Sequence, residues 1–167
     1  MATQAEPGAA AAAAAAASPV WNRVIFLLSL VGVFVAGYLW WAHSVDADIP
    51  CSVGGGCGKL QSSPYSRFPF GSGPPVAAYG ALAYLALAAL AFARSLDPGN
   101  AGRDRRLLLL IVLLSGGGVL ASLCLTYLAL FVVRATCPWC LTSQCLILGI
   151  FSASLLDRLR PSVAAPR

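Results

Sequence analysis

Two pairs of cysteines are the residues of this sequence best suited to chemistry. Cys51 and Cys57 enclose a segment with three consecutive glycines, and Cys137 and Cys140 form the C-x-x-C sequence Cys-Pro-Trp-Cys. Glycine permits backbone conformations that other residues resist, so the first segment can both close a disulfide and move it. Two such pairs indicate thiol–disulfide exchange, in which a thiolate attacks a disulfide sulfur.

The C-x-x-C pair stands at the start of an apolar run, where Pro138 suits the first turn of a helix. Cysteines three residues apart in a helix share one face. Unpaired N–H groups at a helix N-terminus stabilise a negative sulfur, so we expect a lowered thiol pKa at this pair. Arg134 is close in sequence, but boundary arginines usually meet lipid headgroups, and we assign it no catalytic role.

Four apolar runs must position these cysteines. The sequence is 59% hydrophobic and only 10% charged, which is typical of an integral membrane protein. Each run is about the 20 residues that cross a bilayer, and a span in lipid must satisfy its own backbone hydrogen bonds. We therefore predict an all-α, four-helix integral membrane bundle with short connections between antiparallel neighbours. The runs cover residues 24–41, 76–93, 107–133 and from near 137 to before 158.

The basic residues indicate the orientation of the bundle. Four spans place both termini on one side, which carries eight of the eleven Lys and Arg residues; the other side carries Lys59, Arg67 and Arg134. The positive-inside rule then puts the termini in the cytosol and the loop from about Ser44 to Pro75 outside, with both cysteine pairs at the outer face. The net charge of +5 comes from scattered arginines, so no nucleic acid partner is expected.

The chain divides into three parts. Residues 1–19 form an alanine-rich leader that we expect to be disordered, residues 20–160 form the transmembrane domain, and residues 161–167 form a cytosolic tail. A cleaved signal peptide is the alternative interpretation of the first run. That run, however, is long for a signal core and ends at Trp40 and Trp41, which favour the membrane interface.

Two other interpretations of the four cysteines compete with redox exchange. For zinc, the spacing of Cys51 and Cys57 is wider than the usual knuckle, and an oxidising outer face favours disulfides, so no metal is expected. The second alternative is a non-enzymatic four-span scaffold with two structural disulfides. A C-x-x-C disulfide closes a very short ring, however, and stabilises little through loop entropy.

The pair of loop cysteines, a serine shortly after them, and a C-x-x-C that opens the last of four helices together resemble the vitamin K epoxide reductase family. The resemblance covers Trp21 to about Leu156. The short loop spacing is similar to that of bacterial members, which oxidise a thioredoxin-fold partner and reduce quinone. Many bacterial members carry a fused thioredoxin-like domain, whereas this sequence ends at Arg167, so the resemblance implies a separate periplasmic partner.

The resemblance implies a role for each cysteine. Carried over by position, Cys57 would receive the partner's thiolate, Cys51 would relay electrons to Cys137, and Cys140 would lie against the quinone ring. The implied protein is a thiol:quinone oxidoreductase of the bacterial inner membrane that makes disulfides and uses ubiquinone or menaquinone. Vitamin K or its epoxide is the alternative substrate.

Two polar residues are candidates for quinone contact beside Cys140. Ser63 matches the family's serine near the quinone mouth, and a helix cap is the equally weighted alternative for this serine. Gln144 lies one turn after Cys140 on the same helical face, where animal members carry a tyrosine. Its amide would be able to meet a quinone carbonyl.

The loop between the first two spans is expected to hold a short amphipathic lid helix with Tyr65, Phe68 and Phe70 on the bundle. The only histidine, His43, comes at the end of the first span, where a boundary histidine is usually solvated.

Overall fold

The computed structural model describes residues 19–45, 47, 56–69, 71–96 and 100–159. Within these ranges the chain is an all-helical bundle, and four of its helices are long and apolar enough to cross a membrane. The predicted fold class is thereby confirmed, with helices that extend a few residues beyond the apolar runs. The long helices are α2 (Pro19–Ser44), α4 (Val76–Leu96), α5 (Ala101–Tyr127) and α6 (Pro138–Leu159).

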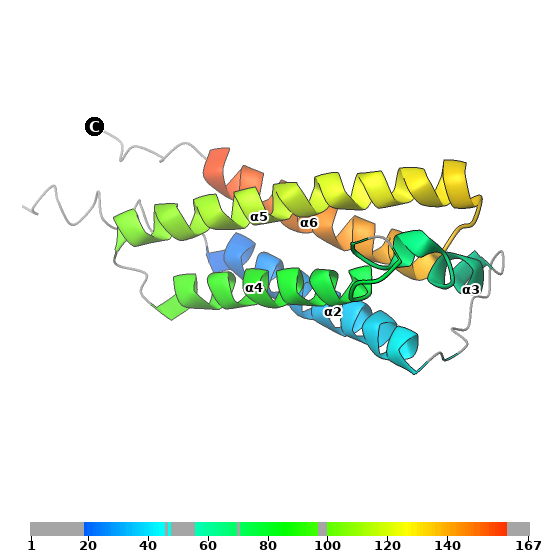
Figure 1. Ribbon diagram of the computed structural model, residues 1–167. Helices are drawn as coiled ribbons and strands as arrows, with labels where there is room; N and C mark the ends of the chain where they lie inside the picture. The colour runs from blue at the N-terminus through cyan, green and yellow to red at the C-terminus, as the bar shows by residue number, and fades with distance from the viewer. Residues whose placement is uncertain (1–18, 46, 48–55, 70, 97–99, 160–167) are drawn as a thin grey trace, which may run out of the picture.

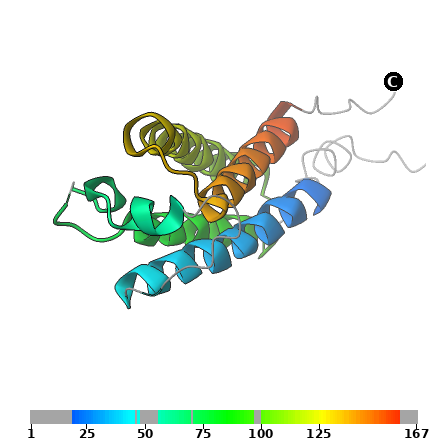
Figure 2. The same cartoon turned by 90° about the vertical axis from the view of Figure 1, so that its right-hand side faces the viewer.

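The four helices form a closed ring. Helix α2 packs against α4 and α6, and α5 packs against the same two helices from the other side (Figure 1). The short helices α3 (Gly56–Gln61) and η1 (Pro64–Ser66) lie between α2 and α4 in the chain, at the end of the bundle where α6 begins (Figures 1 and 2). A π-helical segment, Leu128–Val133, extends α5 toward this same end.

The core of the bundle is apolar and receives one fully buried aliphatic side chain from each long helix: Ile25, Leu87, Ile111 and Ile150. The outer surface is also apolar, because large side chains such as Phe34, Leu120 and Phe131 are mostly exposed. An apolar surface of this extent suits lipid rather than water.

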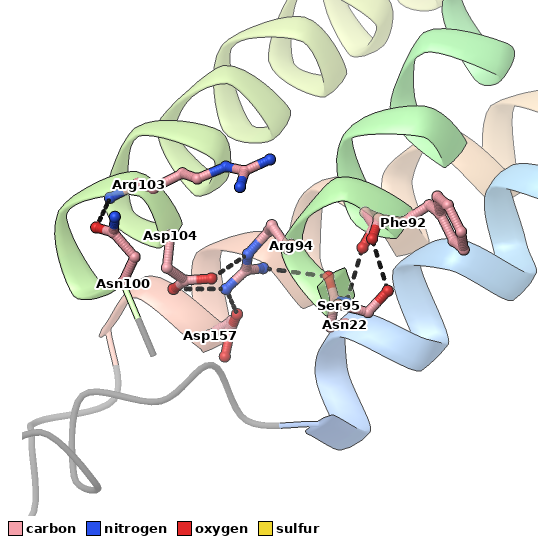
Figure 3. Close-up of polar contacts among 9 residues, drawn as sticks. Asn22, Phe92, Arg94, Ser95, Asn100, Arg103, Asp104 and Asp157 are labelled. Carbon is pink, nitrogen blue, oxygen red and sulfur yellow. Dashed lines mark hydrogen bonds and ion pairs between the residues drawn. The ribbon is translucent and has the colours of Figure 1, made fainter. Parts of the chain in front are cut away.

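The end of the bundle opposite α3 is held by a four-helix polar cluster of Asn22, Arg94, Asp104 and Asp157, one residue from each long helix (Figure 3). Arg94 donates from Nε and Nη2 to the Asp104 carboxylate at 2.8 and 3.1 Å, and from Nη2 to Asp157 at 3.0 Å. Nη1 is 3.5 Å from Asn22 Oδ1. The Arg94 side chain is almost completely buried. This cluster therefore ties all four helices together at one end.

Candidate redox site

The C-x-x-C sequence follows a sharp reversal of the chain. Arg134, which ends the π-helical segment, has φ 53° and ψ 50°, the left-handed conformation that stops a helix. Three residues later Cys137 is buried, and Pro138 begins α6 as predicted. Arg134 thus forms the backbone turn that leads into the C-x-x-C sequence.

Cys57 reaches the C-x-x-C from α3. It is buried and disulfide-bonded, and its Sγ lies 3.4 Å from the Sγ of Cys137. Gly56 makes this approach possible, because a Cβ atom there would lie 2.7 Å from the Thr136 carbonyl oxygen. Most of the predicted glycine-rich segment lies outside the described residues; the structure places Cys57, at its end, in a helical turn packed against the start of α6.

The remaining cysteines occupy different positions. Cys140 is a free thiol exposed on the first turn of α6. Cys124 and Cys145 are free thiols exposed on the surfaces of α5 and α6, as expected for residues within apolar helices. Cys51 lies outside the described residues, so its predicted role is not addressed by the geometry.

The surroundings of Cys137 favour its thiolate. Hydrogen bonding from the Cys140 side chain is the largest influence; burial opposes it, and the backbone N–H groups of Cys140 and Trp139 add to it. Together they lower the pKa of Cys137 to about 6. This agrees with the expectation that unpaired N–H groups at the start of α6 stabilise a negative sulfur.

An apolar cavity of about 550 Å³ adjoins these sulfurs. Cys57, Cys137 and Cys140 all line it, and its walls come from every long helix together with α3, η1 and the π-helical segment. Gly117 and Gly118 of α5 also line the cavity. The lack of side chains at these two positions therefore leaves room for the cavity as well as allowing helices to pack closely. A cavity of this size, largely apolar with few polar groups, has the character of a small-molecule site.

The structure separates the two predicted polar contacts. Ser63 lines the cavity, and its hydroxyl donates to the Leu60 carbonyl at 2.7 Å. Gln144 is not among the lining residues; its Oε1 accepts a short hydrogen bond from Thr126, which does line the cavity. Sequence reasoning missed Thr126, because nothing in its neighbourhood on α5 indicates a polar partner on α6.

The structure also describes two of the predicted lid residues, as well as His43. Of the predicted lid residues, Tyr65 lines the cavity, Phe68 is mostly exposed with its ring edge-on to Tyr79, and Phe70 lies outside the described residues. The expectation that His43 is solvated is wrong. Its side chain is buried at the end of α2 and lines the cavity, because α3 covers this end of the bundle.

The structure describes one of the two loop cysteines. The family resemblance suggested that Cys51 relays electrons to Cys137, and Cys51 lies outside the described residues. The loop sulfur that the structure places beside Cys137 is that of Cys57, 3.4 Å away.

Comparison with known proteins supports the same reading. Residues 23–155 match the model of the vitamin K epoxide reductase family, which is most of the chain. No curated protein matches the sequence.

Proposed function

The chain belongs to the vitamin K epoxide reductase family and is thus a membrane thiol oxidoreductase that uses quinone or vitamin K. We propose that it oxidises the dithiol of a separate thioredoxin-fold protein and reduces a membrane quinone such as ubiquinone or menaquinone. The observation that carries the proposal is the 3.4 Å contact between Cys57 and Cys137 beside an apolar cavity that Cys140 also lines.

The proposed electron path is built on the one sulfur contact that the described residues show between the two pairs, Cys57 with Cys137. The partner's thiolate attacks the disulfide of Cys57 with Cys51 and leaves the loop pair as a dithiol. Cys57 then attacks Cys137 of the oxidised inner pair, so the Cys57–Cys137 bond forms and Cys140 leaves as thiolate. Cys51 resolves this bond, which restores the loop disulfide and leaves Cys137 and Cys140 reduced. Cys51 thus takes the position first given to Cys57, that of the residue facing the partner.

The last step returns the inner pair to its disulfide. Cys137 and Cys140 lose two electrons as their sulfurs bond, and the quinone in the cavity gains them with two protons. Cys140 is the sulfur released away from Cys57, which assigns it to the quinone side. Ser63 offers a hydroxyl on the same wall, whereas Gln144 acts only through Thr126.

The cavity fits a quinone ring. Its volume lies within the range of roughly 300 to 1,000 Å³ found for small-molecule sites. A ring with two carbonyl oxygens needs an apolar enclosure and a few hydrogen-bond donors, and Ser63 and Thr126 place hydroxyls among mostly aliphatic neighbours. To donate to the quinone, each hydroxyl would have to exchange its present bond, to the Leu60 carbonyl or to Gln144, for one to a quinone oxygen.

One experiment tests the whole path. Purified, quinone-depleted protein is reduced with a thioredoxin-like dithiol donor, a ubiquinone analogue is added, and free thiols and quinol are counted together. The proposal expects one quinol for each pair of thiols lost. Thiol loss without quinol formation, or no reduction by the donor, contradicts it. Vitamin K epoxide offered in place of quinone tests the alternative substrate.

The proposed orientation puts the cysteine pairs outside the cytosol of a bacterial inner membrane. It rests on eight basic residues against three, since positive residues are retained on the cytosolic side. A membrane-impermeant thiol label applied to intact cells after mild reduction should modify Cys51 or Cys57. Labelling that requires opened membranes would reverse the orientation.

A further inference from the structure

His43 is the only histidine of the chain, and it lies in the last turn of α2. Its side chain is buried and lines the cavity together with Cys137 and Cys140. The electron path described above leaves this residue without a role. A buried histidine in a mostly apolar wall calls for an explanation, because polar groups are costly to bury.

The proton balance of quinone reduction supplies an explanation for the buried His43. Forming quinol takes two electrons and two protons, and a dithiol that closes to a disulfide gives both protons only when both sulfurs carry hydrogen. The pKa of Cys137, lowered to about 6, leaves that sulfur mostly ionised at neutral pH. Cys140 then contributes one proton, and the second has to come from another group.

The described part of the cavity wall offers few sources for that proton. Among the described residues, the ionisable side chains that line the cavity are those of His43, three tyrosines and three cysteines, with no Asp, Glu, Lys or Arg. Two of the tyrosine hydroxyls are engaged, Tyr79 with the Phe68 carbonyl at 3.2 Å and Tyr84 with the Ser143 carbonyl at 2.7 Å. Imidazole is the side chain that ordinarily exchanges protons between pH 5 and 8.

We propose that His43 is the proton donor for quinone reduction in this cavity, an inference that rests on the proposed function. The step balances as follows. Cys137 and Cys140 form their disulfide, their two electrons pass to the quinone, one proton leaves Cys140 and one leaves the His43 imidazolium. Neutral His43 then regains a proton from water at the outer face, where α2 ends.

The test separates proton donation from thiol exchange. Parent protein and His43→Gln are first reduced at the inner pair, and quinol formation is then followed in single turnovers. Removing a general acid lowers such a rate by roughly 10²- to 10⁴-fold. Added imidazole should restore part of the lost rate in the variant and leave the parent unchanged. Ser44→Ala, one residue away and outside the cavity lining, serves as the matched control and should keep the parental rate.

A second readout keeps the outcome interpretable. Exchange between the loop and the inner pair, measured without quinone by donor-dependent thiol reduction, should be the same in parent and His43→Gln. Quinol formation at the parental rate in His43→Gln overturns the proposal, and so does an equal loss in both assays, which would mark a structural role. If the parent itself fails to make quinol, the proposed function fails as well, so the two failures can be told apart.

Discussion

The Sγ atoms of Cys57 and Cys137 lie 3.4 Å apart, although 80 positions separate the two residues in the chain. This contact makes a specific cross-link predictable. In the double variant Cys51→Ser with Cys140→Ser, a mild thiol oxidant such as diamide can join Cys57 to Cys137, and neither Cys51 nor Cys140 remains to resolve the bond. A Cys57–Cys137 disulfide should accumulate and appear in peptide mass spectrometry without reductant. In the matched double variant Cys57→Ser with Cys140→Ser, a Cys51–Cys137 link should form more slowly; faster formation of that link would restore the order implied by family resemblance.

The reactivity of Cys137 should depend on pH with a midpoint near 6. Its pKa is lowered to about 6, so the reactive thiolate is present above this pH and is lost as the pH falls through it. Iodoacetamide modification of the Cys137 peptide in reduced protein should therefore slow down below about pH 6. Because the hydrogen bond from Cys140 is the largest cause, Cys140→Ala should move the midpoint upward. An unmoved midpoint would contradict this cause.

Filling the cavity should weaken quinone reduction and spare thiol exchange. A Cβ at Gly117 has no neighbour within 4 Å, and the residue lines the cavity, so the side chain of Gly117→Leu would enter it. We expect quinone reduction to fall by about tenfold, which corresponds to about 1.4 kcal/mol of binding. Gly37→Leu is the matched control, since a Cβ there also meets nothing within 4 Å but Gly37 lies outside the lining. Equal losses in the two variants would contradict the location of the site.

Gln144 should matter only through Thr126. Among the described residues, Thr126 is the hydrogen-bond partner of the Gln144 side chain, and losing a hydrogen bond costs about 0.5 to 1.5 kcal/mol. Gln144→Leu should thus weaken quinone use by roughly threefold to tenfold. In the double variant with Thr126→Val the loss should be no larger than in the worse single variant. Additive losses would show that Gln144 contacts the quinone independently.

The four-helix polar cluster should dominate stability at its end of the bundle. Arg94→Met leaves the Asp104 and Asp157 carboxylates without their cation, and such unpaired burial costs about 3 to 5 kcal/mol. Combining it with Asp157→Leu removes one of these charges and should recover part of the loss. Thermal unfolding in detergent measures both effects. Arg158→Met serves as the control: Arg158 follows Asp157 on α6 but is exposed, so this change should alter the free energy of unfolding by less than about 0.5 kcal/mol.

The features that sequence reasoning recovered are those encoded locally. The spans follow from continuous hydropathy, and the start of α6 follows from Pro138 within Cys-Pro-Trp-Cys. The missed features depend on packing between distant segments. Arg94 looked like a flanking basic residue, because its carboxylate Asp157 is 63 positions away. Burial of His43 depends on α3 covering the bundle end, and no local pattern specifies where that helix rests.

The four-helix polar cluster also has a mechanical consequence. With one residue of each long helix joined at the Arg94 end, a helix can move most freely at the opposite end, and each helix behaves as a lever fixed near the cluster. From Asp157 to Pro138 the lever arm is roughly 29 Å, nineteen residues at about 1.5 Å each, so a tilt of about 5° displaces the start of α6 by about 2.5 Å. Such a displacement is comparable to the spacing between Cys57 and Cys137. A tilt too small to disturb the core near the cluster is therefore large enough to engage or separate the two sulfurs.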